Sequence, residues 1–268
     1  MSHNLNAAGT RRLPIYEIAA LLLVGAAAAG VGLVRTMPPS TVLGAYSTDL
    51  TNRTPHQRYN ARRAAAAIDG YAIAPGATFS FDDTVRSWSG DRGFLKAPVS
   101  YNGILIDDYG GGVCETSTTL YNAALLAGLT IVERHAHSFA PSYAPPGRDA
   151  AVAYHTADLK IRNQTAETIT IAIRADSGRI VCRLLSRRRP RDTVRVVTRI
   201  VDRRPAQPMP SSVGASARVL NLHRSQWHVL GRDGVRVQVY RRWYRNGEPG
   251  ESQLVSDNTY LPISRYAW

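Results

Sequence analysis

A glycine-rich run leads into Cys114, one of only two cysteines in the chain. Gly110–Gly112 lie just before it, and the apolar spacing that follows predicts a helix from about Cys114 to Leu126, closed at Gly128. The unpaired N–H groups and the positive end of a helix dipole favour a thiolate at such a position. A cysteine placed in this way can attack a carbonyl carbon.

The base and the orienting group that such a nucleophile needs follow it in the sequence. Residues 129–137 alternate as a strand, which places His135 and His137 on one face, and a loop then leads to Asp149. Histidine would accept the thiol proton, and aspartate would hold the imidazole in the required tautomer. His137 is slightly favoured because it precedes the loop, and His135 stays a candidate. This order is that of transglutaminase-like and papain-like acyl-transfer enzymes.

Two other interpretations use the same four side chains. In one, the site is not catalytic: Cys114 is a buried cap residue and the histidines belong to a polar core. In the other, Cys114, His135, His137 and Asp149 hold zinc. Two histidines at i and i+2 with one cysteine form no specific zinc pattern, so we expect no metal. The sequence has no Ser-x-x-Lys motif, phosphate-binding loop or dinucleotide fingerprint, and we expect no cofactor.

Residues on either side of the cysteine could contact a substrate. The glycines would let a peptide approach the backbone closely. The loop at 139–148 could line a peptide groove, although Pro145–Gly147 is also simply a rigid turn. The expected substrate contacts are Gly111, Gly112, Glu115, Thr118, Tyr143 and Arg148.

The composition points to an anionic partner. The 268 residues include 33 Lys+Arg and 20 Asp+Glu, a formal net charge of +13, and nearly all the positive charge is arginine. The basic runs at 187–191 and 241–245 could bind nucleic acid, anionic lipid or wall polymer, or could be a solvated basic face. If the chain is exported, as its N-terminal segment predicts, anionic lipid, teichoic acid or peptide carboxylates are more plausible partners of these runs than nucleic acid.

The N-terminal part supports export. Residues 15–34 are apolar apart from Tyr16 and Glu17 and follow Arg11 and Arg12, so they predict an anchor just long enough to span a bilayer. A signal peptide with its apolar core near 18–29 is the alternative, and a buried helix is a third. The positive flank places the folded part outside the cytoplasm, anchored in the cell membrane or secreted. Export also allows a Cys114–Cys182 disulfide, which would silence Cys114.

The pattern along the chain predicts an α+β fold of mixed helices and antiparallel sheet with a β-rich C-terminal region. Helical spacing covers 58–69, and strand patterns cover 78–81, 97–101, 129–137, 150–155, 158–162, 168–174, 179–185 and 193–201. We also predict a hairpin over 226–245 that turns at Gly231–Gly234. The expected regions are an anchor or signal peptide at 1–36, a linker at 37–44, a main domain at 45–185, a basic hinge at 186–192 and the β-rich part at 193–268.

Several ordered motifs within residues 45–185 resemble the VanW family, named for an accessory protein of B-type vancomycin resistance clusters. They are Arg58–Asn60, Pro75–Phe81, Gly93–Pro98, Gly110–Ala124, Glu133–Ser138, Tyr143–Asp149 and Asp158–Asn163. The tail from Tyr240 to Pro262 resembles the end of the same module more weakly, and Glu115 stands where the family pattern suggests glutamine. The resemblance implies an exported bacterial envelope protein and leaves the biochemical activity open. We therefore expect the protein to act on or bind peptidoglycan, with a stem peptide or another anionic wall polymer as its partner. The site at Cys114 would carry out acyl transfer or amide hydrolysis, or the domain would be a non-catalytic module that binds peptidoglycan or a partner protein.

Overall fold

The computed structural model describes residues 41–101, 104–188, 190–209, 231–263 and 265–266. They show mixed α and β structure in which most strands pair antiparallel, as the sequence predicts. The apolar segment at 15–34 and the start of the expected hairpin at 226–230 lie outside the described residues. In the described ranges, no helix combines the length and the apolar character needed to cross a bilayer.

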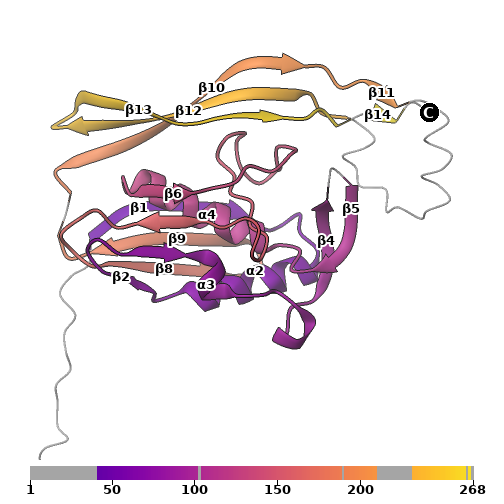
Figure 1. The fold of residues 1–268 in the computed structure, drawn as a ribbon, viewed down its shortest axis with the longest axis horizontal. Helices are drawn as coiled ribbons and strands as arrows, with labels where there is room; N and C mark the ends of the chain where they lie inside the picture. The colour runs from indigo at the N-terminus through magenta and orange to yellow at the C-terminus, as the bar shows by residue number, and fades with distance from the viewer. Residues whose placement is uncertain (1–40, 102–103, 189, 210–230, 264, 267–268) are drawn as a thin grey trace, which may run out of the picture. The chain divides into compact units, whose positions relative to one another are not determined.

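A four-stranded antiparallel sheet forms the base of the main domain (Figure 1). Its order is β1 (Thr41–Asp49), β9 (Arg179–Ser186), β8 (Ile169–Ala175) and β2 (Ala72–Ile73). Alternate side chains of β8 and β9 are buried, as expected of a sheet with one face in the core. Residues 41–44 of the expected linker belong to β1, which starts at Thr41 and pairs with the end of β9.

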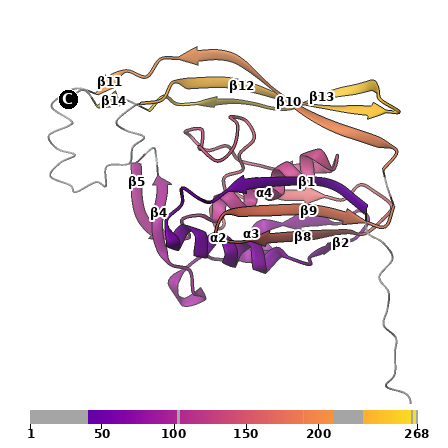
Figure 2. The same ribbon diagram turned by 180° about the vertical axis from the view of Figure 1, so that it is seen from behind.

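Two helices pack against this sheet and against each other: α2 (Pro55–Ile68) and α4 (Val113–Leu126) (Figures 1 and 2). The Thr54 side chain accepts the Gln57 N–H while the Gln57 side chain accepts the Thr54 N–H, a capping box that fixes the start of α2. Apolar and small residues of both helices fill the core, among them Ala61, Ile68, Leu120, Ala123 and Ala124. Leu120, Ala123 and Ala124 thus form the face of α4 that lies in the core.

Short strands complete the main domain. A three-stranded sheet has the order β3 (Thr78–Ser80), β7 (Lys160–Arg162), β6 (Thr130–Glu133), and β4 (Lys96–Tyr101) pairs with β5 (Ile104–Tyr109). The helix α3 (Phe81–Val85) and the 3-10 turn η1 (Gly90–Arg92) lie between β3 and β4 in the sequence.

Two predicted strands are wrong in extent. The strand expected over 129–137 ends at Glu133, after a register shift between Ile131 and Glu133. The strand expected over 150–155 is reduced to isolated bridges, one from His135 to Ala151 and one from Ala153 to Ala157. The histidine region is therefore an irregular segment, in which strict alternation no longer decides where side chains point.

The described residues beyond Asp192 mostly form strands, and the hairpin among them turns at another place than predicted. The strands β10 (Asp192–Arg204), β12 (Gly234–Arg245) and β13 (Glu248–Tyr260) form an antiparallel sheet, and β11 (Pro208–Met209) pairs with β14 (Arg265–Tyr266). Gly234 begins β12, and the turn lies at Asn246-Gly247, where both φ angles are positive (52° and 89°). Asn-Gly is the usual sequence of such a turn, so the signal was present in the sequence.

Candidate functional site

Cys114 lies in the first turn of α4, where the sequence predicts it. Gly112 occupies the N-cap with φ 106°, and no side chain caps the helix. The thiol is partly exposed, and its sulfur donates to the Val152 carbonyl over 3.5 Å. The positive end of the helix dipole therefore acts directly on this side chain.

The glycines before Cys114 serve the packing of this chain's own backbone. A Cβ at Gly112 would collide with the Gln57 carbonyl, and one at Gly111 would lie 2.7 Å from the Pro98 carbonyl oxygen. The Gly111 carbonyl also accepts a hydrogen bond from Asn60 Nδ2 at 2.9 Å. Close approach is required at both positions, but α2 and β4 of the same chain already take up that space.

His137 and Asp149 form the pair expected of a base and its orienting group. His137 Nδ1 lies 2.6 Å from Asp149 Oδ2, and the backbone N–H of His137 donates to the same oxygen at 2.8 Å. Asp149 is fully buried, while the His137 side chain keeps 18% of its surface exposed. A carboxylate bound to Nδ1 fixes the tautomer and leaves Nε2 as the functional nitrogen.

Two further residues hold Asp149 in place, and sequence reasoning missed both. Arg134 Nη2 donates to Asp149 Oδ1 at 2.9 Å, and the Tyr260 hydroxyl donates to the same oxygen at 2.5 Å. Strict alternation put Arg134 on the face opposite the histidines, and the register shift in β6 cancels that rule. The only signal for Tyr260 was the weaker motif in the tail.

The charges at the site favour an ion pair between thiolate and imidazolium. Burial disfavours the Cys114 thiolate, but the hydrogen bond and charge of His137 outweigh it and lower the pKa of the thiol below its ordinary 9.0. Burial also disfavours the charged imidazole, but the hydrogen bonds to Asp149 and Cys114 raise the pKa of His137 to about 10. Both shifts act in the direction that a nucleophilic cysteine needs.

The other candidate base points elsewhere. His135 Nε2 lies 2.9 Å from Glu133 Oε1, and Lys160 Nζ donates to the second oxygen of that carboxylate at 2.7 Å. The His135 side chain is 44% exposed. The structure brings together Cys114, His137 and Asp149 and leaves His135 in a surface ion cluster.

The expected substrate contacts divide into two groups. Tyr143 lies beside the site, packed edge-on against His137 with ring centroids 6.4 Å apart. Glu115 is 1% exposed and accepts a 2.7 Å hydrogen bond from Arg53 Nε, and this guanidinium stacks over Tyr143. Tyr143 and the Arg53–Glu115 pair therefore form one wall beside the thiol.

Thr118 and Arg148 make internal contacts. Thr118 Oγ1 accepts the backbone N–H of Ala150 at 2.9 Å, which fixes the residue next to Asp149. Arg148 Nε donates to Asn122 Oδ1 at 2.5 Å, and its guanidinium stacks over Tyr46. Both side chains support the loop that carries Asp149.

The disulfide does not form, since Cys114 and Cys182 are both free thiols. Cys182 lies in β9 with no exposed surface. In the part of the chain that the structure describes, no group of three histidine, cysteine or acidic side chains is arranged to hold a metal ion. The zinc arrangement is not assembled, because His135 turns to Glu133.

Comparison with known proteins identifies the region that carries this site. A family model described as "VanW like protein" matches residues 56–185. The uncharacterized protein YoaR of Bacillus subtilis is 36% identical over 144 residues, which cover 54% of this chain and 48% of YoaR. The vancomycin B-type resistance protein VanW of Enterococcus faecalis is 32% identical over 137 residues, which cover 49% of this chain and 50% of that protein.

The matched region spans about half the length of each of these curated relatives. No solved structure gives a significant match. Cys114, His137 and Asp149 all fall inside the matched residues, whereas Tyr260 lies beyond them. Through residues 56–185, the chain belongs to the VanW family.

Proposed function

We propose that Cys114, His137 and Asp149 act as nucleophile, base and orienting group in acyl transfer or amide hydrolysis at the bacterial cell envelope. The observation that carries the proposal is the 2.6 Å contact between His137 Nδ1 and Asp149 Oδ2, beside a partly exposed thiol at the start of α4. Transglutaminase-like and papain-like enzymes use the same order of residues along the chain. The site resembles these enzymes in the types of its residues and in their order along the chain.

The chemistry follows from the charges. The Cys114 thiolate attacks the carbonyl carbon of an amide, and a sulfur–carbon bond forms. As the carbon–nitrogen bond breaks, the His137 imidazolium gives its proton to the leaving amine. The neutral imidazole then takes a proton from water, or from an acceptor amine, that attacks the thioester. Hydrolysis or transfer restores the thiolate and the imidazolium.

The start of α4 would stabilise the oxyanion that forms in both steps. The N–H groups of Val113 and Glu115 donate to the Gly110 and Gly112 carbonyls, and the N–H of Cys114 lies between them. This N–H is the natural donor to an oxygen on the carbon that the sulfur attacks. The helix dipole has the correct sign for the same charge.

The substrate that fits best is a stem peptide of peptidoglycan. The resistance protein among the relatives supports a role at the cell envelope, and the net charge of +13 supports an anionic partner. The apolar segment at 15–34 would place the folded part outside the cytoplasm, anchored to the membrane or released.

The test is to trap the thioester. The full chain would be incubated with purified stem peptides, quenched in acid and weighed intact by mass spectrometry. We expect an adduct on Cys114 in the wild type and a much smaller one when His137 is replaced by Asn, because formation of the thioester needs the imidazolium both to hold the thiolate and to protonate the leaving amine. Cys114→Ser should give no thioester. An equal adduct in Cys114→Ala would place the chemistry elsewhere and overturn the proposal.

A non-catalytic wall-binding module is the second candidate, and the excess of arginine favours it. Binding to purified wall that survives Cys114→Ser, with no adduct from any stem peptide, would support this candidate. Loss of wall binding in a folded Cys114→Ser variant would contradict it.

A further inference from the structure

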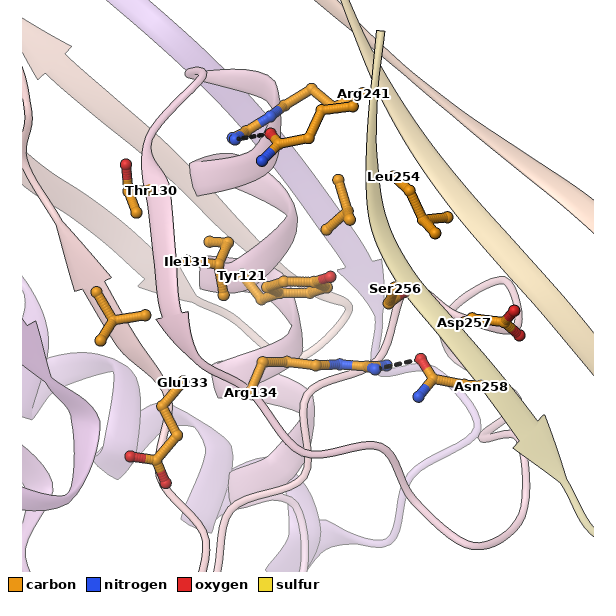
Figure 3. A pocket seen from close by; sticks show the side chains of 13 residues that line it. Tyr121, Thr130, Ile131, Glu133, Arg134, Arg241, Leu254, Ser256, Asp257 and Asn258 are labelled. Carbon is orange, nitrogen blue, oxygen red and sulfur yellow. Dashed lines mark hydrogen bonds between the residues drawn. The ribbon is translucent and has the colours of Figure 1, made fainter.

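A second site lies away from the thiol, in a partly open cavity of about 420 Å³ between α4, β6 and the hairpin of β12 and β13 (Figure 3). The volume falls in the range of small-molecule sites. Cys114, His137 and Asp149 are not among the residues that line it. The cavity is therefore distinct from the proposed site of acyl transfer.

The cavity wall holds buried polar atoms that have no partner. They are the Tyr121 hydroxyl, Arg241 Nε and Ser256 Oγ. Tyr121 is fully buried and Arg241 is 6% exposed. An unsatisfied polar atom costs about 1–3 kcal/mol when buried, so three around one cavity indicate that something else completes them. All three can donate a hydrogen bond, which suits a ligand that accepts.

Arg241 also brings a charge that no carboxylate balances. Its Nη2 donates to Gln253 Oε1 at 2.8 Å (Figure 3). Its Nη1 donates to the Leu129 carbonyl at 2.5 Å, and both acceptors are neutral. None of the ion pairs found in the described residues includes it. Burial lowers the pKa of this guanidinium, the direction expected when no anion compensates the charge. A buried charge is normally paired, and an anion in the cavity would supply the partner.

The other cation in the wall is already compensated. Arg134 Nη2 donates to Asp149 Oδ1 at 2.9 Å. Its Nη1 donates to Asn258 Oδ1 at 2.5 Å (Figure 3). Its guanidinium also lies over the Tyr121 ring, 5.4 Å from the centroid. Arg241 is therefore the cation that an incoming anion would compensate, in a wall that also holds the Tyr121 and Ser256 hydroxyls.

The rest of the lining limits what the anion can be. Glu133 and Asp257 also line the cavity, and they would repel a group with several negative charges. Ile131, Val132 and Leu254 add apolar surface. A single negative charge joined to a short aliphatic part fits this combination best.

We propose that this cavity binds a small aliphatic monocarboxylate, such as an N-acylated amino acid or the C-terminal carboxylate of a short peptide, with Arg241 as the counter-ion. The carboxylate oxygens accept hydrogen bonds from Arg241 Nε and from the Tyr121 and Ser256 hydroxyls. The proposal does not depend on any chemistry at Cys114.

Binding to the full chain would be measured by calorimetry and by the shift of the thermal midpoint. The probes are N-acetylalanine, its neutral carboxamide and inorganic phosphate. We expect N-acetylalanine alone to bind and to raise the midpoint, because only it combines one negative charge with an aliphatic part. Absence of N-acetylalanine binding, or tighter binding of phosphate or of the carboxamide, would overturn the proposal.

Substitutions would locate the binding. Arg241→Gln should weaken N-acetylalanine binding by about 10-fold or more, since it removes a charge-assisted contact. The matched control is Arg242→Gln, the exposed neighbour on β12, which should bind as the wild type does. Equal binding by both variants would refute the assignment.

A second variant guards against misfolding of Arg241→Gln. Tyr121→Phe removes a buried hydroxyl that has no partner in the free protein, so the variant should fold at least as stably as the wild type. It should nevertheless bind N-acetylalanine about 2- to 10-fold more weakly. Undiminished binding in this variant would remove Tyr121 from the site and contradict the proposal.

Discussion

The two cysteines lie in opposite surroundings, although both belong to one hydrophobic core. Cys182 is fully buried in the sheet, and burial raises the pKa of its thiol far above the ordinary value. Cys114 is partly exposed at a helix start beside His137, which lowers the pKa of its thiol. The difference teaches that a charged partner and a helix end favour the thiolate form, whereas an apolar sheet keeps the thiol neutral as a packing residue.

Among the changes that test this contrast, Asp149→Ala should have the largest effect, a loss of free energy of unfolding. The change leaves the Arg134 guanidinium buried without its carboxylate and removes the support of His137. Breaking a buried pair in this way costs about 3–5 kcal/mol. Urea unfolding would measure the loss. Asp176→Ala, in an exposed turn, is the control and should cost far less; equal losses would show that the Asp149 network is not what stabilises the domain.

Two substitutions test whether Cys182 is a packing residue. Cys182→Ser puts a hydroxyl into an apolar layer and should lower the free energy of unfolding by about 1–3 kcal/mol. Cys182→Ala leaves only a small cavity and should cost less. Thermal or urea unfolding would rank them. Neither should change the alkylation rate of Cys114, and a slowed rate would mean that the two thiols are not independent.

His137→Ala should make the Cys114 thiol less reactive, and so more like the thiol of Cys182. Without the imidazolium, the pKa of Cys114 rises, and the thiolate fraction below that pKa falls roughly tenfold for each unit. The alkylation rate of Cys114 would be measured across a pH series from quenched time points analysed by mass spectrometry. His135→Ala is the matched control, since that ring faces Glu133. If both variants alkylate at the same rate, His137 is not the partner of the thiol.

The smallest effect concerns the surface cluster that holds His135. Hydrogen bonds from Lys160 and His135 lower the pKa of Glu133 to about 2. A carboxyl group with a depressed pKa stabilises the fold fully above its unfolded pKa of 4.5, and that contribution is lost as the pH falls toward 2. Because the side chain is 32% exposed, solvent screening limits the gain to about 1 kcal/mol or less.

Glu133→Gln should remove this part of the acid dependence of stability. Urea unfolding from neutral to acidic pH would show a shallower slope between pH 4.5 and 2 than in the wild type. The alkylation rate of Cys114 should stay unchanged. An unchanged slope would show that the cluster contributes nothing to stability.

Much of the architecture could be predicted from local signals. The helix after the glycines, the alternating strands β8 and β9 and the β-rich tail follow from periodicity and turn residues. Cys114, His137 and Asp149 were identified from residue type and order. Arg134 and Tyr260 were not, because a register shift turns the first and a long stretch of chain separates the second from Asp149. The arrangement of a site depends on long-range packing, which one sequence encodes only weakly.

The two thiols can be compared directly in the native protein. The full chain would be treated with iodoacetamide at about pH 6, and each cysteine would be followed by peptide mass spectrometry. The account predicts rapid modification of Cys114, slowed by His137→Ala, and no modification of Cys182 until the protein is unfolded. If Cys114 were modified only after unfolding, or at the same rate as Cys182, it would not be an activated nucleophile.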